Sequence, residues 1–98
     1  MQLADFQMIE KLDMPGGRQA VLDFGNYHLS IVDDGAGSEH GLYEIGVFSA
    51  ADGVATDMVE LPGITAEGDT VKGYLTETDV NVIIMKMHTL TSRIPRQI

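Results

Sequence analysis

Residues 18–33 of the chain read RQAVLDFGNYHLSIVD. Apolar side chains take every second position on either side of the pair Gly25-Asn26, namely Ala20, Leu22, Phe24, Tyr27, Leu29 and Ile31. A period of two is typical of a strand with one buried face, and a Gly-Asn pair between two such runs indicates a tight turn. The stretch therefore predicts a β-hairpin, with the alternate residue His28 on its outer, solvent-facing side.

Two further strands are predicted after this hairpin, over Leu42–Ala50 and Val54–Leu61. A polar loop, Asp33–Gly41, precedes them, and an irregular segment, Pro62–Lys72, follows them. Gly46 inside the third strand indicates a bulge or a close backbone approach. Because consecutive strands with short connections usually pair with each other, the four strands favour an antiparallel meander.

A helix is predicted over Glu77–Thr91. Thr76 supplies a hydroxyl at its start and Asp79 an acid three residues later, the pattern of a capping box. Apolar residues recur at intervals of three and four along it, at Val80, Ile83, Ile84, Met87, Leu90 and Ile94. This broad stripe is typical of a helix that packs on a sheet, and Pro95 prevents its continuation.

A second, shorter helix is predicted over Met1–Asp13, with an apolar residue at every third position, and Met14-Pro15-Gly16-Gly17 ends it. Residues 1–98 are therefore expected to form a single α+β domain, a four-stranded antiparallel meander packed against the C-terminal helix. In the predicted core the helix stripe meets these sheet residues: Ala20, Leu22, Phe24, Leu29, Ile31, Ile45 and Val47.

Composition excludes several classes of protein. The 98 residues include 15 acidic and 6 basic side chains, a formal charge of −9, which disfavours direct binding to nucleic acid. The absence of cysteine excludes disulfides, zinc thiolate centres and cysteine nucleophiles, and favours a reducing compartment such as the cytoplasm. No apolar run reaches the roughly 18 residues of a membrane span, and no secretory signal pattern is present, so neither a membrane nor export is expected.

Candidate chemical sites are few. The loop Asp33–Glu39 is rich in oxygen donors, but it lacks the spacing of a calcium-binding loop, so a solvated loop without metal is expected. No histidine lies four residues from another, which excludes a helical zinc pair among His28, His40 and His88. No nucleotide-binding or nucleophile motif is present. The sequence therefore predicts no cofactor and no catalytic residue.

Val82 and Met85 form a second apolar set on the predicted helix, away from the main stripe. Two interpretations remain open. The stripe is wide and the N-terminal helix covers its edge, or the pair belongs to a self-association surface, since exposed apolar patches on small domains often mark interfaces.

Two segments carry a resemblance to a known group of proteins. They read GLYEIGVF over residues 41–48 and GYLTETDV over residues 73–80. Together with the preceding hairpin they resemble small uncharacterised proteins encoded by tailed bacteriophages. The resemblance covers about residues 18–92 and implies a phage-encoded protein in the cytoplasm of an infected bacterial host. It implies no enzymatic activity.

Three hypotheses of function follow. The first is a non-catalytic protein-interaction module that binds a host or phage protein, as a homodimer. The second is a DNA mimic, whose acidic side chains imitate phosphates and inhibit a nucleic-acid-binding protein. The third is a small enzyme or ligand binder that uses His28, His40 and the acids of the 33–39 loop, and it requires those groups to converge in one pocket.

Overall fold

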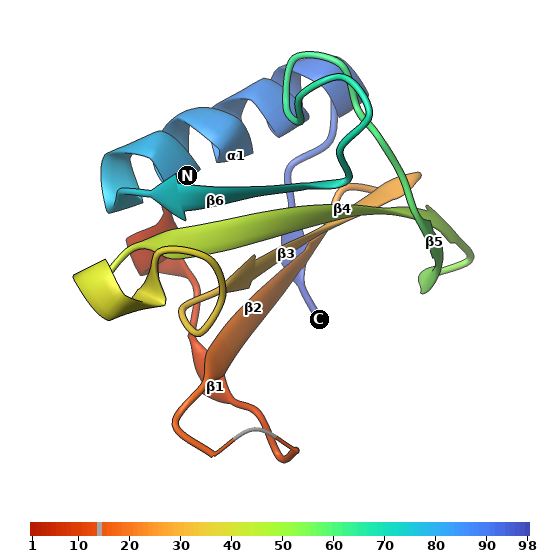
Figure 1. Ribbon diagram of the computed structural model, residues 1–98. Coiled ribbons are helices and arrows are strands. Elements are labelled where there is room, and N and C mark those ends of the chain that lie inside the picture. The colour runs from red at the N-terminus through yellow and green to blue at the C-terminus, as the bar shows by residue number, and fades with distance from the viewer. Residues whose placement is uncertain (14) are drawn as a thin grey trace.

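The computed structural model describes residues 1–13 and 15–98 and has an α+β architecture. Three antiparallel strands form its centre: β2 (Arg18–Asp23), β3 (Tyr27–Val32) and β4 (Tyr43–Ala51). The helix α1 (Glu77–Thr91) lies across one face of this sheet (Figure 1). The hairpin, the antiparallel order and the C-terminal helix that the sequence predicts are thereby confirmed.

Each outer edge of the central sheet is covered by two short strands. β1 (Ile9–Glu10) and β7 (Arg96–Gln97) pair with opposite ends of β2. β5 (Val54–Met58) and β6 (Val71–Leu75) pair with opposite ends of β4. The predicted count of four strands is therefore wrong, since seven strands are present in the described part of the chain.

Strand β6 was not predicted, and its first two residues fall in the segment 62–72 that the sequence analysis assigns to an irregular region. Its register with β4 shifts between Tyr43 and Ile45, so that Gly73 and Tyr74 bulge out opposite a single residue. Such a bulge interrupts the period of two by which a strand is recognised. The alternation of apolar residues therefore does not predict this short strand.

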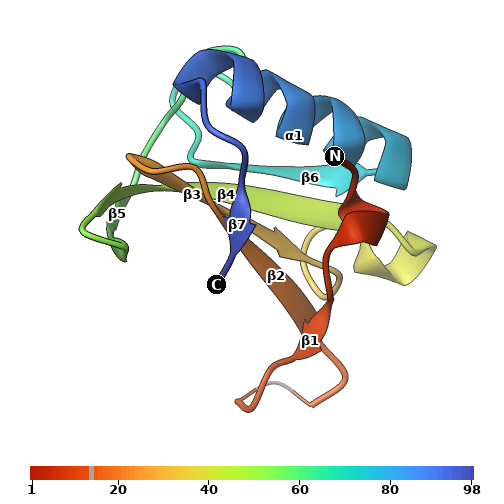
Figure 2. The ribbon, with the colours of Figure 1, turned by 180° about the vertical axis from the view of Figure 1, so that it is seen from behind.

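The predicted N-terminal helix is wrong. Only Leu3–Asp5 turns, as the 3-10 helix η1, and the chain then extends into β1. An isolated helix of this length is marginal in water, and here tertiary hydrogen bonds take its place. The Leu3 N–H donates to Asn81 Oδ1 of α1 at 2.7 Å. The side-chain amide of Gln97 accepts from the Gln7 N–H and donates to the Gln7 carbonyl. The two terminal segments therefore both run along the β2 side of the molecule (Figure 2). Met14, assigned to the end of that helix, lies outside the described residues.

α1 begins and ends where the sequence predicts. The Asp79 N–H donates to Thr76 Oγ1 at 3.1 Å, and the Thr76 N–H donates to Asp79 Oδ2 at 3.0 Å, which completes the capping box. The bond from the Thr76 backbone is the main cause that holds the pKa of Asp79 below its usual value. The helix ends at Thr91, and the capping residue Ser92 has a left-handed backbone with φ 56°.

The predicted sheet core is confirmed in full, because all seven of its residues are buried. The helix stripe is confirmed at Val80, Ile83, Ile84 and Met87, and it is wrong at Leu90, which is 55% exposed, and at Ile94. At 100° per residue, Leu90 lies at the edge of the stripe, and Ile94 lies beyond the end of the helix. Exposed apolar side chains therefore remain around the last turn.

We expect Thr76→Ala to lower the free energy of unfolding by about 1 kcal/mol, because the substitution removes the hydroxyl that caps α1. Urea denaturation followed by circular dichroism measures the change. Thr78→Ala is the matched control, since the side chain of this exposed neighbour makes no hydrogen bond among the described residues and alanine favours the helix. Equal stability of the two variants would contradict the assignment of the cap.

Candidate functional site

The outer face of α1 points away from the sheet and remains uncovered. Thr78, Val82, Met85 and Thr89 follow one another along it at intervals of four and three, and all four are exposed. Val82 and Met85 are each 49% exposed. The N-terminal segment packs beside the helix, at Asn81, and does not cover this pair. Of the two interpretations of this pair, burial under the N-terminal segment is therefore excluded.

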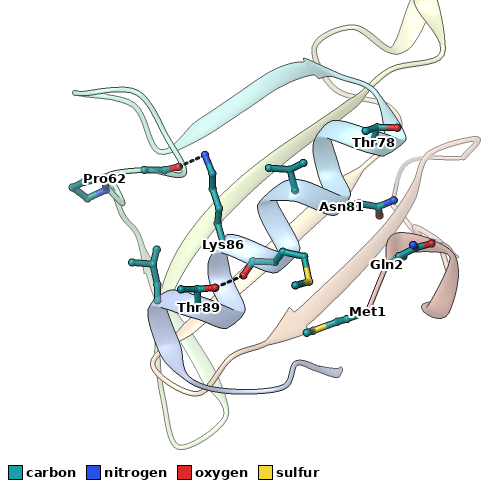
Figure 3. A pocket seen from close by; sticks show the side chains of 11 residues that line it. Met1, Gln2, Pro62, Thr78, Asn81, Lys86 and Thr89 are labelled. Atoms are coloured by element: carbon teal, nitrogen blue, oxygen red, sulfur yellow. Dashed lines mark hydrogen bonds between the residues drawn. The ribbon is translucent and has the colours of Figure 1, made fainter.

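An open groove of about 860 Å³ runs along this face (Figure 3). It is lined by Met1, Gln2, Pro62, Gly63, Thr78, Asn81, Val82, Met85, Lys86, Thr89 and Leu90. The N-terminal residues form one side and the turn at Pro62-Gly63 the other. Two ionisable groups belong to this lining, and both have partners: Lys86 Nζ donates to the Gly63 carbonyl at 3.3 Å, and the terminal ammonium group of Met1 lies 3.4 Å from Asp5 Oδ2. The groove is therefore apolar at its centre and nearly free of charge.

The charge of α1 differs from that of the rest of the chain. Its acidic side chains, Glu77 and Asp79, both lie in the first turn. No acidic residue occurs from Val80 to the end of the sequence, whereas this part contains Lys86, Arg93 and Arg96. In a chain with a formal charge of −9, most of α1 is thus neutral or basic.

Tyr74, at the bulge in β6, is a second unusual feature of this surface. Its backbone is left-handed, with φ 57°, a conformation that bulky residues rarely adopt, and its side chain is 61% exposed. A hydrogen bond of 3.0 Å from the Tyr74 N–H to the Ala36 carbonyl holds the bulge. The residue lines a smaller hollow with Lys72, Asp79 and Val82, so it adjoins the outer face of α1. No pattern in the sequence marks it, because the strain arises only when β6 pairs with β4.

His28 is not on a solvent-facing surface, and that prediction is wrong. Its side chain is 3% exposed, and its Nε2 lies 3.6 Å from Asp23 Oδ1 without a hydrogen-bond partner among the described residues. In the sheet register His28 lies between Asp23 of β2 and Phe48 of β4. Asp23 itself accepts from the Gly25 N–H at 2.7 Å and lies 3.5 Å from the Arg96 guanidinium.

We expect His28→Leu to leave the free energy of unfolding within about 1 kcal/mol of wild type, or to raise it, because leucine removes a buried nitrogen that lacks a partner. His28→Ala should lower it by about 2 kcal/mol, since it leaves a cavity. Denaturant melts of both variants measure this. If leucine destabilises as much as alanine, this prediction is contradicted. The imidazole then makes a stabilising interaction, and Asp23 is the nearest candidate partner.

The groups of the enzyme hypothesis do not converge. His40 lies in the 3-10 helix η2 (Ser38–His40), 3.7 Å from Glu39, and not against Asp33 or Asp34. Asp33 pairs with Arg18 at 2.8 Å, and Asp34 pairs with Lys11 at 2.9 Å. His28 lies at the turn end of β3, and the 33–39 loop begins at its opposite end. Among residues 1–13 and 15–98, no cluster of three or more possible metal ligands occurs.

His88, the third histidine, lies near the end of α1. Its Nδ1 is 2.9 Å from the Arg93 carbonyl. This contact ties the segment after the helix back onto its last turn, so a structural role accounts for the residue.

The ion pair between Arg18 and Asp33 links the two ends of the central hairpin. Burial raises the pKa of Asp33, but the hydrogen bonds that it accepts from the Arg18 backbone and side chain outweigh this, and the net pKa is lowered. A carboxylate with a lowered folded-state pKa stabilises the protein above its unfolded pKa, near 3.8. This contribution is lost as the pH falls through the folded-state value.

We therefore expect Asp33→Asn to reduce stability near neutral pH and to converge with wild type as the pH falls below about 4. Arg18→Gln should show part of the same pH dependence, because it removes the guanidinium and keeps the backbone donor. Thermal melts across the acid range give the comparison. A difference that persists unchanged to about pH 2 would contradict this role of the carboxylate.

Comparisons of the chain with protein-family models, with curated proteins and with solved structures gave no match. Among the described helices, none combines the length and the apolar character needed to cross a membrane. The geometry of the α1 face therefore carries the functional argument.

Proposed function

We propose that this protein is a small, non-catalytic protein-interaction module that binds through the outer face of α1. The observation that carries the proposal is the exposure of Val82 and Met85 at the centre of an open groove. Exposed apolar patches with a polar rim mark protein-binding surfaces on small domains. The groove has this character, since Thr78, Asn81, Lys86 and Thr89 surround its apolar centre.

The setting that we propose comes from the resemblance in residues 41–48 and 73–80. It is a phage-encoded module in the cytoplasm of an infected bacterium, where partners are host or phage proteins. The absence of cysteine fits a reducing compartment. The excess of acidic side chains, with a formal charge of −9, supports high solubility and disfavours nucleic acid as the direct partner.

The DNA-mimic alternative requires free acidic side chains that gather on one face. Asp23, Asp33 and Asp34 each lie within 4 Å of a basic side chain and are partly neutralised. The other acids are spread over several elements, including the turn at Asp52, the 60–69 loop and the first turn of α1. This distribution lends no support to a mimic, so the interaction module is the better proposal.

The absence of cysteine allows a direct test, because a single introduced cysteine can carry a photo-crosslinker. We expect Val82→Cys, labelled with benzophenone-maleimide and irradiated in bacterial extract, to form a discrete adduct with a protein. Val54→Cys is the matched control, since Val54 is an equally apolar, exposed residue on β5.

An adduct with a second copy or with a foreign protein supports the proposed binding face, provided that the Val54 position does not give it. No adduct, or the same adducts at both positions, contradicts the proposal.

A further inference from the structure

We propose that the partner on the outer face of α1 is a second copy of this chain, bound as an antiparallel, two-fold symmetric helix pair. This inference rests on the proposed function, because it names the occupant of the same face. A two-fold interface uses one patch twice, so the patch must be complementary to itself. The charges and the residue spacing of the α1 face meet this condition.

Charge selects the antiparallel orientation. Glu77 and Asp79 lie in the first turn of α1, and Lys86 lies in its second half. A parallel pair would place each charge against its own copy. An antiparallel pair places the acidic end of each helix near the basic half of the other and also opposes the two helix dipoles favourably.

The exposed pair at the centre of the face sets the register. A two-fold axis midway between Val82 and Met85 brings Val82 of one protomer against the partner's Met85, and this contact occurs twice. The same axis brings Thr78 opposite the partner's Thr89. The interface then has an apolar centre bounded by neutral hydroxyl groups, the usual anatomy of a specific interface.

One flank of the helix adds complementary contacts. Asp79 and Lys86 are seven residues apart, so both project from the same flank, where Tyr74 and Leu90 also lie. In the antiparallel pair this flank lies against the same flank of the partner, which runs in the opposite direction. Lys86 then approaches the partner's Asp79, and Tyr74 approaches the partner's Leu90, which is 55% exposed.

Tyr74 supplies the anchor that a short helix needs. A 15-residue helix is only about 22 Å long, and a specific interface buries about 1,000 Å² or more in total, so side chains beside the helix must contribute. Exposed tyrosines are frequent at the energetic centres of interfaces. Tyr74 is held in a strained left-handed conformation, and strain of this kind is typical of functional positions.

The first experiment measures the mass of the purified chain by sedimentation over a wide range of concentrations. We expect a concentration-dependent dimer of the 10.6 kDa chain, and a monomer for Val82→Asp/Met85→Asp. Val54→Asp on β5 controls for the added charge and should remain dimeric. Lys86→Glu should weaken the dimer, because it repels the partner's Asp79, whereas Lys86→Arg should not.

Tyr74→Gly separates an interface role from a structural one. Glycine adopts φ 57° without strain, so the melting temperature of the monomer should stay the same or rise. The dissociation constant of the dimer should nevertheless increase by about tenfold or more, because the aromatic anchor is lost. An unchanged dissociation constant would overturn the role of Tyr74.

The register is tested by disulfide formation between two single-cysteine chains, Val82→Cys and Met85→Cys. The antiparallel pair predicts that a mixture forms mainly the mixed disulfide, since helix axes about 8–10 Å apart bring facing positions within disulfide reach. Disulfides between identical positions only would overturn the antiparallel register.

A wild-type chain that stays monomeric overturns the dimer. If the benzophenone at position 82 still captures a foreign protein, the proposed function survives that result. If it captures nothing, both proposals fail.

Discussion

The structure depends on the packing of one helical stripe, Val80, Ile83, Ile84 and Met87, on one face of the sheet. A chain of 98 residues buries a limited core, and here α1 covers most of it, with Leu3 of η1 and Ile64 of the loop after β5 completing the cluster. Burial of about four large side chains contributes roughly 1.5–3 kcal/mol for each, a large part of the net stability of a small domain.

The dependence on a single helix has a consequence for function. With no second layer above it, the outer face of α1 meets solvent, and its character is set by residues that the core does not constrain. Val82 and Met85 are apolar there, although the helix would fold equally well with polar side chains at these positions. Folding does not require these two apolar side chains, and this is why the proposed binding face is placed there.

The short strands protect the edges of the central sheet. β1 and β7 divide one edge of β2, and β5 and β6 divide one edge of β4, so neither long strand leaves a continuous row of unpaired backbone groups. The same division produces the two irregular sites of the molecule. The end of β7 brings Arg96 to the pair of Asp23 and His28, and the bulge of β6 presents Tyr74 beside α1.

Local patterns in the sequence determined the central hairpin, the limits of α1 and its cap, and most of the core residues, because each depends on neighbours within a few positions. The buried residues Leu3, Ile64 and Leu75 lie outside these patterns and were not predicted. Tertiary structure alone decided the rest. Leu3 and Ile9 have helical spacing, yet pairing with β2 and the bond to Asn81 give this segment its extended course. The burial of His28 and the strain of Tyr74 arise from strands paired across the sheet, and pairing between distant segments leaves no periodic signal in the sequence.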